Sequence, residues 1–230
     1  MTAQATVLRG RESIAEGTMA FHFYKPAGFS FKPGQAIDLT LVNPTSADVA
    51  STRHTFSIVS APSEDLITIA TRMRDSAFKN ALASLPIGAA AELDGPFGSL
   101  TLHSNRARPA VFIAGGIGIT PFMSILRQAV HDQLPQRFIL VYSNHRPEVT
   151  AFLDELRRLE HDKRNFRFLP VMTQPNGRVD RDLIARVKNE ASTAVYYVTG
   201  SPAMVAGIRQ LLANAAIKDD DVRSEEFFGY

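Results

Sequence analysis

A glycine-rich turn near the middle of the chain has the residue types and spacing to hold a phosphate group. It runs Ala114-Gly115-Gly116-Ile117-Gly118-Ile119-Thr120-Pro121. Glycines let a ligand approach the backbone closely, and the start of the following helix offers free N–H groups and a partial positive charge. Thr120 is typical of an N-cap, and Pro121 of the first helical position. We therefore expect a pyrophosphate site formed by Gly116, Ile117, Gly118 and Thr120.

Position 121 leaves an alternative open. The usual dinucleotide-binding fingerprint has a third glycine there, and this chain has Pro121. A plain strand-to-helix turn of an α/β domain has the same spacing.

A second turn near the C-terminus repeats the arrangement. Thr199-Gly200 follows the apolar run 194–198, and Ser201-Pro202 repeats the pair of a capping residue and a proline. Met204 opens the apolar stripe of the next helix, for which core packing is the ordinary explanation. If both strands lie in one parallel sheet, both helices begin at its carboxyl edge, where ligands of open α/β sheets bind.

From residue 110 onward, predicted strands and helices alternate along the chain, and these elements position the two turns. This alternation predicts a parallel sheet with helices on both faces. Strands are expected at 110–115, 138–142, 166–171 and 194–198, and helices at 121–133, 148–160, 180–190 and 202–215.

The first hundred residues show short strands separated by turns, which predicts a small antiparallel β-barrel. One helix interrupts the strands: Ser76 caps it, and Pro86 with Gly88 ends it. The polar segment 105–109 is expected to separate a barrel domain, residues 1–104, from an α/β domain, residues 108–230. Strands are expected around 19–23 and at 36–42, 53–60, 66–71 and 90–93, the last ended by Gly95-Pro96-Phe97-Gly98.

Composition excludes several classes of protein. The 230 residues include 25 Lys and Arg against 23 Asp and Glu, and a formal net charge of +2 gives no reason to expect nucleic-acid binding. Absence of cysteine excludes disulfides, thiolate nucleophiles and iron–sulfur clusters ligated by cysteines of this chain, and we expect no metal site. Without a long apolar stretch or a signal-peptide core, we expect a cytoplasmic protein with no membrane span.

Five segments, taken in order, resemble motifs of the ferredoxin-NADP reductase superfamily, which joins a flavin-binding barrel to a nicotinamide-dinucleotide domain. The central loop matches without a break, and the resemblance covers nearly the whole chain. The segments are His54-Thr55-Phe56-Ser57 (flavin motif Arg-x-Tyr-Ser), Gly95-Pro96-Phe97-Gly98 (barrel-ending turn), 115–121 (dinucleotide loop), 199–204 (Cys-Gly-Pro motif) and Glu225-Glu226-Phe227 with Tyr230 (aromatic C-terminus).

Three residues depart from the superfamily pattern. His54 replaces the arginine that pairs with the flavin pyrophosphate, and Arg53 points to the opposite face of the strand. A neutral imidazole still donates one hydrogen bond, and an imidazole protonated beside the anion is the alternative. Backbone N–H groups at Ser76 and Ala77 are expected to contribute more. Phe56 replaces a tyrosine, and Thr199 replaces a cysteine near the nicotinamide.

The resemblance assigns the remaining site residues, with FAD as the flavin. Phe56 and Ser57 would lie against the flavin ring. Arg72 and Arg74 would reach its pyrophosphate or adenylate, although solvated arginines are common at strand ends. The implied catalytic residues are Ser57, Thr199 and Tyr230, with Tyr230 or Phe228 as an aromatic lid. The other implied cofactor contacts are His54, Thr55, Thr71, Met73, Ser76, Ala77, Gly200, Ser201 and Met204.

The donor is expected to be NADPH, with NADH as the alternative. Ser143, Asn144 and Arg146 follow the second strand of the α/β domain, where the superfamily holds the 2′-phosphate of NADPH. A planar guanidinium suits phosphate, and no acidic residue occurs in this turn before Glu148. Alternatively, Arg146 only pairs with Glu148 or Asp154.

The resemblance implies a reductase that passes electrons from NAD(P)H through FAD to a separate acceptor: ferredoxin, flavodoxin, another redox protein or a small molecule. Two alternatives stay open. One is a flavin-binding electron-transfer or regulatory subunit without its own NAD(P)H turnover. The other is a reductase that uses free flavin as a substrate or holds FMN, which the change to His54 permits.

Overall fold

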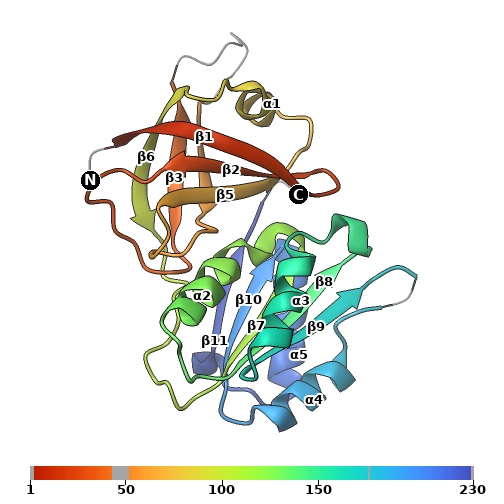
Figure 1. Cartoon of the computed structure of the whole chain (residues 1–230). Helices are drawn as coiled ribbons and strands as arrows, with labels where there is room; N and C mark the ends of the chain where they lie inside the picture. The colour runs from red at the N-terminus through yellow and green to blue at the C-terminus, as the bar shows by residue number, and fades with distance from the viewer. Residues whose placement is uncertain (1–2, 43–51, 176, 229–230) are drawn as a thin grey trace. The chain divides into compact units, whose positions relative to one another are not determined.

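The structure is a computed structural model, and it describes residues 3–42, 52–175 and 177–228. Contacts within the chain divide it into two compact units (Figure 1). Unit 1 comprises residues 1–101 and 120–132, and unit 2 comprises residues 102–119 and 133–230. Each unit is described by itself below.

Unit 1 contains a six-stranded antiparallel sheet in the order β4-β3-β6-β1-β2-β5. The sheet curls toward closure, because the N–H of Val59, just past β4, donates to the Thr68 carbonyl of β5 at 2.8 Å. The strands are β1 Gln4–Ala15, β2 Thr18–Tyr24, β3 Ala36–Leu41, β4 Arg53–Ser57, β5 Leu66–Arg72 and β6 Ala90–Phe97.

Three strands of unit 1 differ from the sequence prediction. Strand β4 was expected over 53–60 and ends at Ser57. The long strand β1 was missed, because its register against β2 shifts at 8–10 and again at 13–15, and such bulges break the apolar alternation. Strand β6 was predicted to end at Leu93 but continues to Phe97. The register of β3 against β6 shifts there, which accommodates Gly95 and Pro96 inside the ladder.

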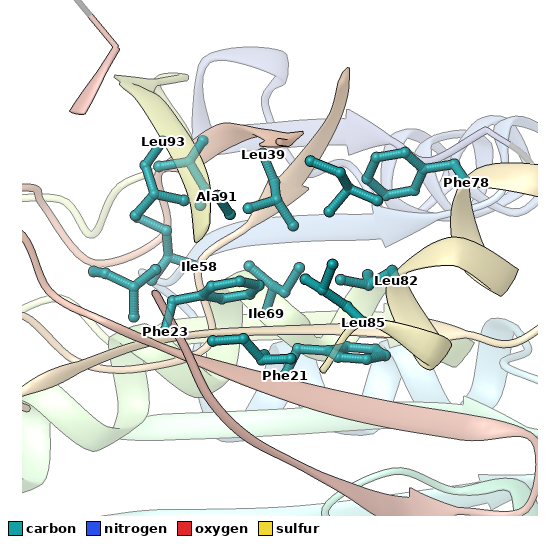
Figure 2. Close-up of a cluster of buried hydrophobic side chains, with 14 of the residues drawn as sticks. Phe21, Phe23, Leu39, Ile58, Ile69, Phe78, Leu82, Leu85, Ala91 and Leu93 are labelled. Carbon is teal, nitrogen blue, oxygen red and sulfur yellow. The ribbon is translucent and has the colours of Figure 1, made fainter. Parts of the chain in front are cut away.

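One helix, α1 (Ala77–Ser84), closes the core of unit 1. Ser76 occupies its N-cap position, as predicted. Figure 2 shows Phe78, Leu82 and Leu85 from this helix region pointing at apolar side chains of the sheet. The labelled partners from the sheet and the segment after β4 are Phe21, Phe23, Leu39, Ile58, Ile69, Ala91 and Leu93.

A second helix, α2 (Thr120–His131), also belongs to unit 1. The Ser124 hydroxyl donates to the Ser60 carbonyl at 2.7 Å, and the Ser63 N–H donates to the Gln128 side chain at 3.0 Å. The helix begins at Thr120 itself, and a 3₁₀ turn precedes it directly. The prediction of Thr120 as an N-cap before Pro121 was therefore wrong by one position.

Gly34 lies in the turn before β3, where a side chain has no room. Its φ of +94° falls in the left-handed region. A Cβ built on it would lie 2.1 Å from the Leu100 carbonyl oxygen. This turn and the segment that leaves the sheet therefore approach each other backbone to backbone, which only glycine permits.

Unit 2 contains a five-stranded parallel sheet in the order β11-β10-β7-β8-β9. An antiparallel sheet followed by a parallel α/β sheet is the predicted fold class, which the structure confirms. The elements are β7 Ala110–Gly115, η1 Gly116–Ile119, β8 Phe138–Asn144, η2 Pro147–Val149, α3 Leu153–Asp162, β9 Phe166–Met172, α4 Arg181–Glu190, β10 Val195–Gly200, α5 Pro202–Asn214, η3 Asp219–Asp221 and β11 Val222–Glu226.

The helices of unit 2 cover both faces of its sheet. Strand residues such as Val111 and Ile139 share a core with Ile184 of α4 and Ile208 of α5. Connections between parallel strands are right-handed, so α3, which leads outward from β8 to β9, lies on the opposite face. Helix α3 begins later than predicted, at Leu153, because Phe152 adopts a left-handed φ of 60° after the 3₁₀ turn. No helix of the described residues is long and apolar enough to cross a membrane.

A buried histidine joins three parts of unit 2. His103 Nδ1 lies 2.9 Å from the Tyr197 hydroxyl, and Nε2 lies 3.2 Å from the Arg108 carbonyl oxygen. The Gln136 side chain donates to the same carbonyl at 2.7 Å. Burial is the main cause that lowers the pKa of His103 below its ordinary 6.5.

The histidine predicts a pH dependence of stability. A native pKa below the unfolded one means that the unfolded chain binds the proton first as the pH falls. Stability is therefore kept above pH 6.5 and lost as the pH drops from there toward the native pKa, by at most about 1.4 kcal/mol per pH unit for one proton. Between pH 7 and 5, the melting temperature of His103→Gln should fall less steeply than that of the parent. Parallel slopes in calorimetry would contradict this.

Candidate functional site

The candidate nucleotide site lies where the strand order of the parallel sheet reverses. From β7 the chain moves outward through β8 to β9, and then returns to β10 on the other side of β7. Ligands of open α/β sheets bind outside the carboxyl ends of the strands at such a switch point. The two predicted turns lie there side by side, because Thr199 of β10 is in register with Ala114 of β7.

Two side chains hold the glycine loop in place from neighbouring strands. The Thr199 hydroxyl, fully buried, donates to the Gly118 carbonyl at 2.6 Å. The Tyr142 hydroxyl of β8 donates to the Gly116 carbonyl at 2.9 Å. Gly116 itself has a φ of +53°, which favours glycine. Both bonds use carbonyl groups of the loop, so its N–H groups are not consumed by them.

The glycines of the site are needed for close packing within unit 2. A Cβ on Gly118 would lie 2.9 Å from the carbonyl carbon and oxygen of Thr199, so close packing within the unit also requires a glycine here. A Cβ on Gly115 or Gly200 would lie 2.1 or 2.9 Å from the Met204 sulfur. Met204 thus fills the space beneath both strand ends, as core packing predicted.

The second predicted turn has the expected cap. Ser201 is the N-cap of α5, its hydroxyl oxygen accepts from the Met204 N–H at 3.4 Å, and Pro202 is the first helical residue. Thr199, which the resemblance made catalytic, uses its hydroxyl proton on Gly118. A catalytic role for it stays a prediction.

At the end of β8, the structure places Ser143 next to Gly115 in the register and leaves Asn144 without a partner. Asn144 is 4% exposed, and neither its amide nitrogen nor its amide oxygen has a hydrogen-bond partner among the described residues. A buried amide without partners is costly, which favours a site that a polar ligand completes. The Arg146 guanidinium lies 3.6 Å from the Glu148 carboxylate, so the ion pair anticipated as the alternative is present.

The C-terminal strand brings further residues to this edge. Glu225 of β11 is in register with Thr199, and burial raises the pKa of its carboxyl group above the ordinary value of 4.5. The Phe227 N–H donates to the Gly200 carbonyl at 2.9 Å, which continues the pairing one residue past the strand. Phe228 is 80% exposed. Tyr230 lies outside the described residues.

In unit 1, the predicted flavin motif forms β4, an edge strand of the sheet. The His54 and Phe56 rings both approach Phe78 of α1, with centroids 4.2 and 6.0 Å from it. The Thr55 hydroxyl instead donates to Asp38, so its side chain is not brought to the same group. Ser57 is buried at the end of the strand.

The residues predicted after the fourth strand lead directly from β5 into α1. Thr71 is buried, Arg72 and Met73 are partly buried, and Met73 packs against the core. Arg74 and Ala77 are exposed. The structure thus brings the predicted flavin contacts among residues 54, 56 and 72–77 to the start of α1.

One basic residue at this turn was missed by sequence reasoning. Lys79 lies so near His54 that, after burial, its charge is the second cause that lowers the pKa of the imidazole below 6.5. Nothing local in the sequence marks Lys79, because it looks like an ordinary polar position of an amphipathic helix. The residues present fit both cofactors: basic groups at α1 suit the flavin phosphates, and the Asn144 amide and the glycine loop suit a dinucleotide.

Comparison with known proteins supports this interpretation of the two units. Residues 112–210 match the family model of the oxidoreductase NAD-binding domain. The reductase component of propane 2-monooxygenase from Rhodococcus jostii is 29% identical over 211 residues, which cover 85% of this chain and 55% of the relative. A flavohemoprotein from Oceanobacillus iheyensis is 25% identical over 86% of this chain and 52% of its own length. The chain thus spans about half the length of these curated relatives.

Solved structures share the fold over nearly all of the chain. A ferredoxin NADP+ reductase from Neisseria gonorrhoeae with bound FAD and NADP has a TM-score of 0.80 at 23% identity, covering 99% of this chain and 100% of its own. The FAD/NAD-binding domain of a nitric oxide dioxygenase from Vibrio cholerae has a TM-score of 0.79 at 17% identity, covering 99% of both chains.

Proposed function

We propose that the chain is an FAD-dependent NAD(P)H oxidoreductase of the ferredoxin-NADP reductase superfamily that delivers electrons to a separate acceptor. The observation that carries the proposal is the paired turn of unit 2. There, the loop Gly116–Ile119 is bonded to Thr199 at the switch point, inside the segment that matches the NAD-binding domain. The predicted domain boundary near residue 105 and the cytoplasmic location are part of this proposal.

When bound, FAD accepts a hydride and can release electrons one at a time. The chain's own residues bind and orient. The glycine loop and the start of α2 hold the dinucleotide phosphates through backbone N–H groups, and Phe56 and Ser57 support the flavin ring. Hydride transfer needs the reacting atoms about 3–3.5 Å apart. We propose Phe228 or Tyr230 as an aromatic lid that would give way to the nicotinamide.

The decisive experiment is anaerobic reduction. The purified full chain, loaded with FAD, is mixed with NADPH or NADH, and bleaching of the flavin absorbance is followed. Rapid bleaching supports the proposal; a bound flavin that neither nucleotide bleaches would show an electron-transfer or regulatory subunit instead. Turnover with ferricyanide tests delivery to an outside acceptor. By analogy with the monooxygenase reductase component, we propose a protein acceptor, such as an oxygenase component, a ferredoxin or a flavodoxin.

For the donor we propose NADPH, recognised by Arg146 with Ser143 and Asn144. Arg146→Ala should raise KM for NADPH roughly ten- to a hundredfold, the value of a hydrogen bond to a charged group, and leave KM for NADH nearly unchanged. Glu148→Gln is the matched variant: it removes the carboxylate 3.6 Å from the guanidinium, so KM for NADPH should fall. Equal changes for both nucleotides in steady-state kinetics would exclude Arg146 as the discriminating residue.

A further inference from the structure

The first turn of α1 carries a basic side chain without an acidic partner. Lys79 is the third residue of this helix, is half-buried, and makes no hydrogen bond or ion pair with any other described residue. No acidic residue lies in the first turn. Asp75, just before the helix, is exposed and accepts from the Asn80 side chain at 3.5 Å.

This is an unfavourable place for a lone cation. The N-terminus of a helix carries a partial positive charge, and Ser76 at the N-cap makes no side-chain hydrogen bond to the first N–H groups. Burial first, and the charge of Arg74 second, lower the pKa of the Lys79 ammonium below 10.5. An anion bound at this turn would stabilise the ammonium group, and the described residues place no carboxylate against it.

The strand beside this turn offers no free cation of its own. The His54 ring stands 4.2 Å from that of Phe78, so it lies beside α1, but its lowered pKa leaves the imidazole neutral at pH 7. Arg53, the other basic residue of β4, pairs with Asp38 at 2.6 Å and Asp94 at 2.9 Å. Where the superfamily has an arginine at position 54, this chain therefore has a neutral hydrogen-bond donor.

We propose that Lys79 supplies the positive charge that holds the diphosphate of the bound flavin, replacing the arginine missing from position 54. The inference rests on the proposed function, because it takes FAD as the ligand. Side chains of a helix lean toward its N-terminus, which directs the Lys79 stem to the first turn. The backbone N–H groups of that turn and the neutral His54 then add hydrogen bonds around the same phosphates.

The test compares two flavins that differ in charge. Apoprotein of the full chain is titrated with FAD and with riboflavin, which has no phosphate, and quenching of flavin fluorescence gives Kd. Lys79→Met should weaken FAD binding roughly ten- to a hundredfold and leave riboflavin binding unchanged. Lys79→Arg should retain most of the affinity for FAD. Lys32→Met, at an exposed lysine in a turn of the same unit, is the matched control and should change neither Kd.

Three results would overturn the inference: unchanged FAD affinity in Lys79→Met, an equal loss for FAD and riboflavin, or a larger FAD-specific loss in His54→Gln than in Lys79→Met. The second result would mean that Lys79 only supports the fold. A different result would contradict the proposed function. A chain that binds FAD through Lys79 but is reduced by neither NADPH nor NADH overturns that function and leaves this inference standing.

Discussion

Gly118→Val is expected to lower kcat/KM for the nicotinamide cofactor by roughly a hundredfold or more, while FAD stays bound to the chain. A Cβ at this position would stand 2.9 Å from the carbonyl carbon and oxygen of Thr199, and two further methyl groups add to the overlap. Backbone cannot rotate away as a side chain can, so the loop and the end of β10 must separate. Overpacking of this kind costs about 1–3 kcal/mol or more. The Thr199 hydrogen bond to the loop is lost with it.

Stopped-flow reduction and the flavin absorbance of the purified protein check both halves of this expectation. Gly207→Ala is the control, since Gly207 lies inside α5 and a Cβ there meets no atom within 4 Å. That change should keep full activity and raise stability by about 0.5–1 kcal/mol. If Gly118→Val lost its flavin instead, the loop would serve the flavin, and the assignment of unit 2 to the nicotinamide would be wrong.

Gly34→Ala should lower the melting temperature of unit 1 more than any other single methyl addition considered. The added Cβ would lie 2.1 Å from the Leu100 carbonyl oxygen, and the φ of +94° is itself unfavourable for alanine. A loss of about 3 kcal/mol corresponds to roughly 6–12 °C in a protein of this size. Scanning calorimetry, with release of flavin fluorescence as a second probe, measures it.

A substitution at Gly28 distinguishes the two causes of that loss, which are the contact with Leu100 and the left-handed φ. Its φ of +78° is also left-handed, but a Cβ there meets nothing within 4 Å. Gly28→Ala should therefore cost only the backbone strain, about 1–2 kcal/mol. Equal losses of stability in the two variants would show that the close approach of Gly34 to Leu100 does not contribute to the cost.

Sequence patterns predicted the elements whose signals are local. Strand β7 occupies the predicted residues, because its continuous apolar run has a clear boundary at each end. Helix α5 begins where Ser201 and Pro202 predicted. Strand β1 was missed because its bulges disturb the alternation, and α3 began late because the left-handed Phe152 has no signature in an L-residue sequence.

In the candidate site, too, only features with local sequence signals were predicted. The rule for parallel sheets predicted that the two turns meet at one edge, which the structure confirms through the register of β7 with β10. The bond from Thr199 to Gly118 joins residues 81 positions apart, and nothing in either segment specifies it. The sequence could not predict a role for Lys79, because only folding brings its charge close to His54. The assigned roles of the individual cofactor contacts remain predictions that the binding and kinetic experiments test.

The division of the chain limits how such a protein can be recombined. The loop Gly116–Ile119 belongs to unit 2, and α2, which begins at the very next residue, belongs to unit 1. A single crossover near residue 105 would therefore join one parent's sheet to the other parent's helix and separate Ser124 from the Ser60 carbonyl it evolved with. An exchange that respects the packing needs three junctions, close to residues 101, 119 and 132. Gene shuffling among relatives should then favour progeny in which α2 is inherited with the six-stranded sheet of unit 1 and the glycine loop with the parallel sheet of unit 2.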